Sequence, residues 1–499
     1  MKSRTLICAM VMTGFAVLAV PSRMAAQHTH YKLVDMGTLG GPASYLTEPG
    51  VGFGELVLNS RGEVAGKSDT STPNKGSGNC PPICFDTKVF RWQSGVLTPL
   101  DGLSTVIDNS DVGSINARGW ISGNSATGEI DPLTGGQIVH AVLWKDDEIT
   151  DLGTLGGLWS AGTYVTDGGA VAGISTINTI PDPFSFLGAS IHPFIWKNGV
   201  MQDLGTLGGS DAFPGPSCAN EGSHQVTGAS FIDSTPNPTG VPTAHPFLWE
   251  NGKMTDLGTL GGTMALFDVA QCVNNRGQVA GVSTLPGDQI IHPFLWDRGV
   301  LTDLGTLGGD FTITTWLNDA GEVVGGTTTA GEVSFDATLW RGGAITDLGT
   351  LDGDCGNLAR AVNSTGQIVG ESDSCDGITI RAVLWDKGEI VDLNTLIPPN
   401  SSLQLGIAEN INDRGEIAGW GGRPAGCEDV LACGHAFLLI PCVTPQDCGG
   451  TDDISPRTES PSNTVTLTQR QEMTKKFVAR LRARMAQRYR APGLGAPRN

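Results

Sequence analysis

The stretch HPFLWENGKMTDLGTLGG at residues 245–262 decides the fold of this 499-residue chain, because most of it is repeated. Its last seven letters, DLGTLGG, recur at 151–157, 203–209 and 303–309, with single-letter variants at 35–41 and 347–353. The tryptophan that precedes them recurs in register, at Trp92, Trp144, Trp196, Trp249, Trp296, Trp340 and Trp385. A pattern that returns every ~45–55 residues predicts a repeat architecture in which neighbouring units complete one another's core.

Each repeat predicts four short strands. In the unit that follows Gly262, these strands are Leu266–Asn274, Gln278–Ser283, His292–Asp297 and Val300–Leu304. The tight turns within the unit contain Gly277 and Gly299, and glycine tolerates the positive φ that such turns need. Apolar residues occur on both faces of the strands, so each sheet must pack between two others. Four-stranded sheets packed in this way are the blades of a β-propeller.

The number of repeats predicts a closed ring. The first three strands of the unit occur eight times, ending at residues 435–440, but no fourth strand follows the eighth copy. An additional strand, Tyr31–Met36, precedes the first copy and can fill that place, which removes exposed sheet edges. We therefore predict an all-β fold, a β-propeller of about eight four-stranded blades closed by the N-terminal strand, over residues 27–440. An open β-solenoid and two smaller β domains remain as alternatives.

The two ends of the chain differ from the repeats. Residues 1–26 combine Lys2 and Arg4 with an apolar run and end in Ala25-Ala26, which is the pattern of a secretory signal peptide. We therefore expect export, to an extracellular or periplasmic location. Residues 441–466 predict a disulfide turn and a linker, and residues 467–499 a basic amphipathic helical tail. The apolar stripe of that helix consists of Met473, Phe477, Leu481, Met485 and Tyr489.

Charge is divided unevenly along the chain. The net charge is −20, which argues against nucleic acid as a partner because phosphates would be repelled. Residues 451–499 nevertheless hold 10 basic and 4 acidic side chains. Three interpretations of the basic helix stay open: it lies on an anionic membrane surface, it docks on an acidic propeller, or it is a solvated tail. The sequence does not predict the oligomeric state.

Ten cysteines follow the predicted signal peptide, and an even number in an exported chain predicts disulfides. Proximity in sequence suggests the pairs Cys80–Cys84, Cys218–Cys272, Cys355–Cys375, Cys427–Cys433 and Cys442–Cys448. The cysteines lack the paired spacing of zinc ligands, so we expect no metal site and no cofactor.

The repeated motifs resemble those of a known family. His435-Ala436-Phe437, its HPF variants at 192–194, 245–247 and 292–294, and the DLGTLGG copies are similar to the HAF-repeat family of bacterial extracellular proteins. The resemblance covers roughly residues 31–440. It implies export and a repeat architecture, and it implies no defined reaction. Repeats one, six and seven depart from the pattern, with Lys88, Asp336 and Arg381 at the histidine position.

The repeated histidines and aspartates are expected to be structural, because a catalytic group is needed once and these occur many times. We expect the histidines to donate hydrogen bonds near the ends of the blades, and the aspartates to bind backbone amides at the turn into the next blade. No known catalytic motif appears in the sequence. We therefore predict that the chain is not an enzyme and has no catalytic residues.

The predicted function is non-catalytic binding of a glycan polymer or a protein, through the loop face of the propeller. The candidate ligand-binding residues are aromatic side chains in the connections between repeats: Tyr45, Trp159, Phe213 and Phe311. The alternative is a glycoside hydrolase or polysaccharide lyase that acts in the central funnel. That alternative requires loop acids such as Asp131, Asp182, Asp211, Asp310 and Asp354 to converge.

Overall fold

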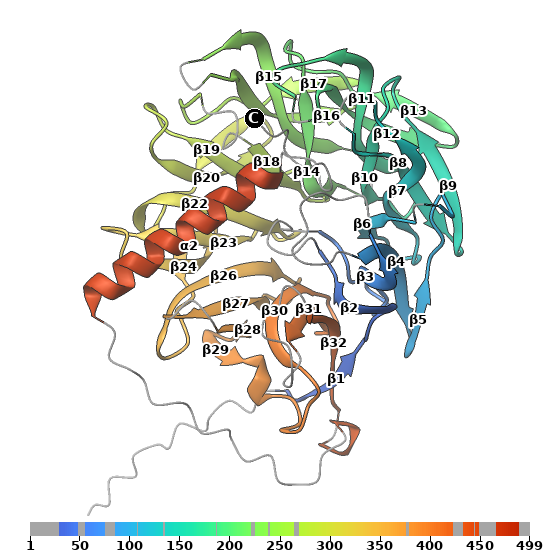
Figure 1. The fold of residues 1–499 in the computed structure, drawn as a ribbon. Helices are drawn as coiled ribbons and strands as arrows, with labels where there is room; N and C mark the ends of the chain where they lie inside the picture. The colour runs from blue at the N-terminus through green and yellow to red at the C-terminus, as the bar shows by residue number, and fades with distance from the viewer. Residues whose placement is uncertain are drawn as a thin grey trace, which may run out of the picture.

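The computed structural model describes residues 29–47, 55–74, 85–106, 108–132, 135–185, 187–220, 225–237, 240–263, 269–375, 379–422, 433–443, 445–448 and 466–488. The fold is all-β, with 59% strand and 5% helix. Figure 1 shows four-stranded sheets arranged around a common centre, which is a propeller-like arrangement. The predicted signal peptide, residues 1–26, and most of the predicted disulfide turn and linker, through residues 449–465, lie outside the described residues.

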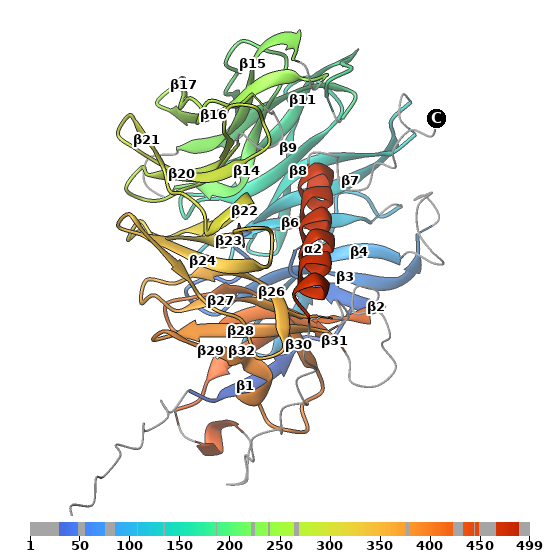
Figure 2. The same cartoon turned by 90° about the vertical axis from the view of Figure 1, so that its left-hand side faces the viewer.

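The first four sheets are antiparallel and follow the order of the chain. They consist of β2 (Gly40–Tyr45), β3 (Val64–Pro73), β4 (Phe85–Gln93) and β5 (Val96–Pro99); β6 (Ser110–Ile115), β7 (Ile121–Ile130), β8 (Gln137–Lys145) and β9 (Glu148–Gly153); β10 (Ser160–Val165), β11 (Val171–Pro181), β12 (Ala189–Lys197) and β13 (Val200–Asp203); and β14 (Ala212–Ala219), β15 (Val226–Pro236), β16 (Pro242–Glu250) and β17 (Lys253–Asp256). Their second and third strands are longer than the first and fourth strands and form long hairpins (Figure 2).

The next three groups of four strands repeat the pattern with shorter second strands. They consist of β18 (Val269–Val273), β19 (Val279–Thr284), β20 (Ile291–Asp297) and β21 (Val300–Asp303); β22 (Gly308–Leu317), β23 (Val323–Thr329), β24 (Phe335–Arg341) and β25 (Ala344–Asp347); and β26 (Asp354–Val362), β27 (Ile368–Ser374), β28 (Ile380–Asp386) and β29 (Glu389–Asp392). One parallel bridge, between Phe335 and Gly356, joins β24 to β26.

The last sheet brings together the two ends of the repeat region. It contains β30 (Gln404–Ile411), β31 (Ile417–Gly422) and β32 (His435–Pro441), with β1 (Tyr31–Asp35) as its fourth strand. The antiparallel register between β1 and β32 pairs Val34 with Leu438. The place that the sequence predicts for the N-terminal strand is the place that β1 occupies.

The hairpin turns use left-handed backbone conformations, as the X-Gly pairs predict. Asn198 and Gly199 have φ of 52° and 84°, the conformation of a type I′ turn, which matches the twist of the strands it joins. The turn between the first and second strands is capped by an asparagine. Asn59 Oδ1, for example, accepts hydrogen bonds from the backbone amides of Arg61 and Glu63.

A second set of hydrogen bonds links these asparagines from one sheet to the next. The side-chain amide of Asn274 donates to the carbonyl of Asn318 at 3.0 Å, and that of Asn318 donates to the carbonyl of Asn363. The same bond joins Asn59 to Asn116, Asn116 to Thr166, Asn220 to Asn274, Asn363 to Asn412 and Asn412 to Asn59. The sequence predicted the turn caps and missed these bonds between sheets.

Helix α2 (Leu467–Arg488) packs against β24 and β26 (Figures 1 and 2). Two short 3-10 helices, η1 (Leu393–Thr395) and η2 (Pro445–Cys448), also lie among the described residues. Phe477 and Val478 are buried, and Met473 is partly buried. The side chains of the other predicted stripe residues lie outside the described part of the chain. None of the described helices has the length and apolar character needed to cross a membrane.

Two of the predicted disulfides are present, Cys355–Cys375 and Cys442–Cys448. Cys433 is also disulfide-bonded, and Cys272 is buried. The side chains of Cys80, Cys84, Cys218 and Cys427 lie outside the described residues, so their predicted pairings are not tested.

Candidate functional site

The repeated histidines pair with the repeated aspartates. His245 Nδ1 lies 2.9 Å from the Asp256 carboxylate, and the same pair joins His140 to Asp151, His192 to Asp203, His292 to Asp303 and His435 to Asp35. The Asp256 carboxylate also accepts the Gly258 amide, at 2.7 Å. The predicted bond to a backbone amide is therefore confirmed. The histidine partner was missed, although the constant spacing of eleven residues signals it.

Four of these carboxylates, Asp35, Asp151, Asp203 and Asp256, are held in their charged form. Burial alone would raise the pKa of Asp256, but the hydrogen bonds from His245 and the Gly258 amide outweigh burial and hold that pKa below its ordinary value. At Asp35, Asp151 and Asp203 burial would also raise the pKa, but the hydrogen bonds from the paired histidine and a backbone amide outweigh it and lower that pKa. The repeated pairs therefore stabilise the junctions between third and fourth strands.

Three of the four aromatic residues proposed to bind a ligand are buried. Phe311 is 0% exposed, and Trp159 and Phe213 are each 8% exposed. All three belong to one apolar cluster that also contains Phe477 and Val478 of α2. Tyr45, at the end of β2, is partly exposed and stands apart from this cluster. The four rings therefore do not form a common exposed platform.

The loop acids that the hydrolase alternative needs do not all converge. Asp182 and Asp211 hydrogen-bond each other, and Asp211 also binds the Ile191 amide at 2.9 Å. Burial raises the pKa of Asp211 to about 6. Carboxyl groups in direct contact are closer than the ~5 Å or more that glycoside cleavage requires. Asp354 instead binds Ser372 and Arg381.

The first strand of most sheets contains a β-bulge, and the side chain at the bulge differs from sheet to sheet. In the pairing of the first strand with the second, one residue of the first strand is skipped. That residue lies three positions before the residue that begins the turn between the two strands. The skipped residues are Gly113, Thr163, Gln271, Thr315, Arg360 and Glu409. A bulge turns its side chain out of the regular pleat, and bulges are frequent next to active sites. The repeat fixes the backbone here but leaves the side chain free to vary.

Two of these bulge residues, Arg360 and Glu409, have opposite charges and form an ion pair. Arg360 lies between Glu409, at 2.8 Å, and Glu371, at 2.9 Å, with all three side chains at most 4% exposed. Burial alone would lower the pKa of Arg360, but the two carboxylates raise it, so the guanidinium stays charged. Thr47 donates to Glu409 at 3.4 Å. We refer to Arg360, Glu371, Glu409 and Thr47 as the Arg360 network.

A second buried charged group lies between the first and second sheets. Lys67 Nζ is 3.0 Å from Asp111 Oδ2, with side-chain exposures of 8% and 21%. Asp69 is two residues along β3 and therefore on the same face as Lys67. Burial raises the pKa of Asp69 to about 6, and the nearby Lys67 charge limits the rise. We refer to Lys67, Asp69 and Asp111 as the Lys67 site.

The Lys67 site stands out against the repeat. The position of Asp69 is held by a threonine in three other sheets, as Thr176, Thr284 and Thr328, and by an aspartate in the seventh, Asp373. The position of Lys67 is apolar in the third, fourth and fifth sheets, which have Ile174, Ala229 and Val282 there. A buried carboxyl group with a shifted pKa beside a buried lysine is a candidate for function. Aligning the repeats and searching for charged exceptions would have found this site from the sequence.

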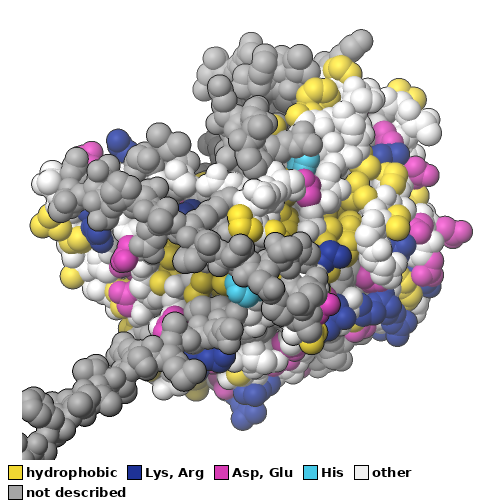
Figure 3. Space-filling view, turned by 90° about the horizontal axis from the view of Figure 1, so that it is seen from below, with side chains coloured by type: hydrophobic (Ala, Val, Ile, Leu, Met, Phe, Trp, Pro, Cys, Tyr) yellow, Lys and Arg dark blue, Asp and Glu magenta, His cyan; other side chains and the backbone are white. Residues whose placement is uncertain are grey.

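Among the described residues, no three histidine, cysteine, aspartate or glutamate side chains are grouped as metal ligands. On the side of the molecule seen in Figure 3, acidic and basic side chains lie next to one another on the described surface. The chemistry available at the Lys67 site is that of the buried Asp69 carboxyl group beside the Lys67 ammonium group.

Comparison with known proteins gives no family. No family model and no curated protein matches the chain. Similar solved structures include a Pyrococcus horikoshii acylaminoacyl peptidase, at 11% identity and a TM-score of 0.40 over 76% of this chain and 57% of that one. A Porphyromonas gingivalis dipeptidyl peptidase 4 is also 11% identical, with a TM-score of 0.45 over 73% and 57% of the two chains. The chain thus spans little more than half the length of these two peptidases.

A polysaccharide lyase described as an ulvan lyase is 10% identical, with a TM-score of 0.37 over 80% of this chain and 95% of that one. The three similar structures named here are enzymes, which contradicts the predicted non-catalytic binding role. With every TM-score below 0.5, the similarities assign no activity to this chain. Any function must be argued from the site itself.

Proposed function

We propose that this chain is a β-propeller enzyme in which Asp69 of the Lys67 site is the general acid–base. The observation that carries the proposal is the buried Asp69 carboxyl beside Lys67, with a pKa of about 6. A carboxyl group with a pKa near neutrality can both take and return a proton at the pH of use. Its ordinary counterpart, near 3.8, would be a weak base.

The ammonium group of Lys67 gives the site a second function. Its bond to Asp111 fixes its position, and its charge can stabilise negative charge that develops on a substrate. The side chain of Asp111 is 21% exposed, so the site reaches solvent on this side. We infer a reaction that begins with proton abstraction next to a carbonyl or carboxylate group, since that step needs a base and a cation together.

The scaffold proposed for this site is a closed propeller of eight blades. The fourth-strand position of β1 beside β32 and the bond from Asn412 to Asn59 support closure. The HAF and DLGTLGG motifs support membership of the HAF-repeat family, and the composition of residues 1–26 supports export. The contacts of Thr474 and Phe477 with β24 and its preceding loop support docking of the basic helix on its own propeller rather than on a membrane.

The first test is a direct titration of Asp69 by carboxyl ¹³C NMR, with the signal assigned from its loss in Asp69→Asn. We expect a midpoint near pH 6. A midpoint near 4 would overturn the acid–base assignment, whatever the substrate.

The second test is turnover of a panel of carboxylate-bearing oligosaccharides and esters by wild type, Asp69→Asn and Asp303→Asn. Asp303 is a matched control because it is a repeated structural aspartate in an exposed pair. We expect Asp69→Asn to lose at least about a hundredfold in rate, and Asp303→Asn to keep its activity. The wild-type rate should rise with pH through about 6 as Asp69 loses its proton. A rate that Asp69→Asn leaves unchanged would contradict the proposal.

A further inference from the structure

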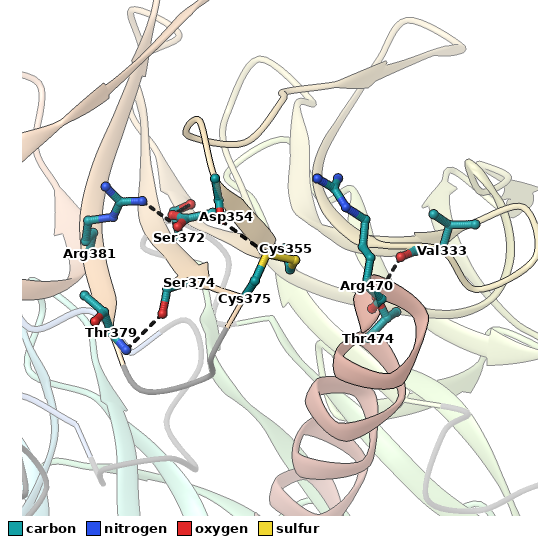
Figure 4. The surroundings of a disulfide bond; sticks show 11 residues. Val333, Asp354, Cys355, Ser372, Ser374, Cys375, Thr379, Arg381, Arg470 and Thr474 are labelled. Carbon is teal, nitrogen blue, oxygen red and sulfur yellow. Dashed lines mark hydrogen bonds and ion pairs between the residues drawn. A yellow bond between two sulfur atoms is a disulfide. The ribbon is translucent and has the colours of Figure 1, made fainter. Parts of the chain in front are cut away.

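Helix α2 rests on a seat built from the sixth and seventh groups of strands. Thr474 Oγ1 donates to the carbonyl of Val333 at 2.9 Å. The ring of Phe477 lies 5.2 Å from that of Phe335, and a Cβ built on Gly356 would lie 3.9 Å from Phe477. We refer to Val333, Phe335 and Gly356 as the α2 seat. Figure 4 shows Val333 and Thr474 in contact beside the Cys355–Cys375 disulfide.

The α2 seat depends on the corner where β26 begins. Gly356 in that corner bridges to Phe335 of β24, which is the backbone link between the two groups of strands. The adjacent Cys355 is bonded to Cys375, just beyond the end of β27. The disulfide therefore fixes the corner that positions both Gly356 and, through the bridge, Phe335.

One sulfur of this disulfide is open to attack. Cys355 is only 4% exposed, whereas Cys375 is partly exposed. A thiolate of a dithiol reductant can attack Cys375 Sγ, displacing the Cys355 thiolate and forming a mixed disulfide. The second thiol of the reductant then displaces Cys375. The two electrons that reduce the disulfide come from the dithiol, which ends as its own disulfide, and both cysteines end as thiols.

We propose that the Cys355–Cys375 disulfide is a redox-controlled latch for α2, so that its reduction by a dithiol releases the helix from the α2 seat. Without the covalent tie the corner of β26 loosens, and Phe477 loses the fixed surface on which it packs. The helix is joined to η2 through residues 449–465, so it stays attached to the chain after release. Release uncovers the rings of Phe335 and Phe311, which lie 6.1 Å apart. The latch is independent of the Lys67 site.

The test is hydrogen exchange of residues 467–479, followed by mass spectrometry, in oxidised protein and after treatment with dithiothreitol. Reduction of Cys355 and Cys375 is verified by thiol alkylation. Two double variants complete the design. Cys355→Ala with Cys375→Ala mimics the reduced latch, and Cys442→Ala with Cys448→Ala removes a second disulfide as the matched control. We expect exchange in α2 to become about tenfold faster in the reduced protein and in the first variant. The control should keep wild-type protection.

Unchanged exchange in α2, with both cysteines verified as alkylated, would overturn the proposal. So would an equal loss of protection in the control variant. If amides of β26 and β27 exchanged as fast as those of α2, the disulfide would be holding the sheet rather than the helix. Continued protection of these strands while α2 exchanges is the result that supports a latch.

Discussion

The side-chain amide of Asn412 donates a hydrogen bond to the backbone carbonyl of Asn59, 3.1 Å away across 353 residues of sequence. The same amide donates to Glu416, and its oxygen accepts from the amides of Arg414 and Glu416. Asn318 makes an equivalent set of bonds within an internal junction, to Glu322 and the carbonyl of Asn363. The junction between the chain's two ends is therefore built like an internal one.

Replacing Asn412 with alanine should therefore cost as much as replacing Asn318. Each change leaves several buried polar groups unsatisfied, and we expect each to lower the free energy of unfolding by about 2–4 kcal/mol. Urea denaturation of the two variants checks this. A cost for Asn412→Ala well below that for Asn318→Ala would indicate a loose junction between Asn412 and Asn59.

The more deeply a His–Asp pair is buried, the more we expect it to contribute to the free energy of unfolding. His435, which joins the two ends through Asp35, is 3% exposed at its side chain, whereas His245 is 22% exposed. We expect His435→Ala to cost about 1–3 kcal/mol and His245→Ala less than about 1 kcal/mol, from urea curves at pH 6.

The cost of His435→Ala should depend on pH. Burial would raise the pKa of Asp35, but the bonds from His435 and Gly37 hold it below 3.8. The stabilisation is therefore complete above that value and is lost as pH falls through the folded-state pKa. The stability gap between wild type and His435→Ala should therefore close as the pH falls through the folded-state pKa of Asp35, which lies below 3.8. A gap that persists below that pKa would rule out this origin for the stabilisation.

The alternation of HAF and HPF has a structural reason that can be tested. The Ala141 amide donates to Ser160 of the next sheet at 2.8 Å, and the amide of Ala436 donates to Ser44. At Pro193 the amide hydrogen is missing, and the next sheet has Ala212 in place of the serine, whereas the sheet after Pro293 has Thr312 there. Ala141→Pro should therefore destabilise the protein by about 1–3 kcal/mol.

The double variant Ala141Pro/Ser160Ala should be less destabilised than the sum of its single changes, because both partners of one bond are removed together. Urea denaturation of the four members of this cycle measures the coupling. Strict additivity would show that the bond does not account for the alternation.

The fold could be predicted because its information is repeated. The hairpin glycines, the tryptophan register and the Tyr31–Met36 strand lead to four-stranded sheets and to the pairing of β1 with β32. Bonds between sheets, such as Asn274 to Asn318, could not be derived from one repeat alone, because they depend on how neighbouring sheets stack.

The site was harder to predict for the opposite reason. Lys67 differs from its counterparts in the other repeats, and only the fold places Asp111 of the next sheet beside it. The aromatic residues were assigned to an exposed loop face, but Phe311 and Phe213 pack in a core that α2 completes. Whether a loop aromatic is exposed depends on such long-range packing.

Asp336 provides a test of electrostatics under α2. Burial raises its pKa to about 6, with Asp347 adding to the rise and Arg470 of α2 opposing it. A raised pKa means that the folded state binds the proton more tightly, so stability is lost as pH rises from about 4 to 6.

The substitution Asp336→Asn removes the loss of stability at high pH, because asparagine carries no charge. Its side-chain oxygen can still accept the hydrogen bond from Ser334. We expect a gain of about 2–3 kcal/mol at pH 8 and none at pH 4. Urea curves at the two pH values measure it, with the exposed Asp347→Asn, expected within about 0.5 kcal/mol of wild type, as the control. Destabilisation at pH 8 would mean that the charge of Asp336 is needed in the fold.

Hydrogen exchange of the unmodified protein tests most directly whether the N-terminal strand closes the ring. Peptides that cover β1 should exchange as slowly as peptides from β31 and β32, because β1 amides are bonded within the same sheet. Protection of β1 that matches the rest of this sheet is the predicted result. Exchange of β1 within seconds, with β31 and β32 still protected, would contradict closure.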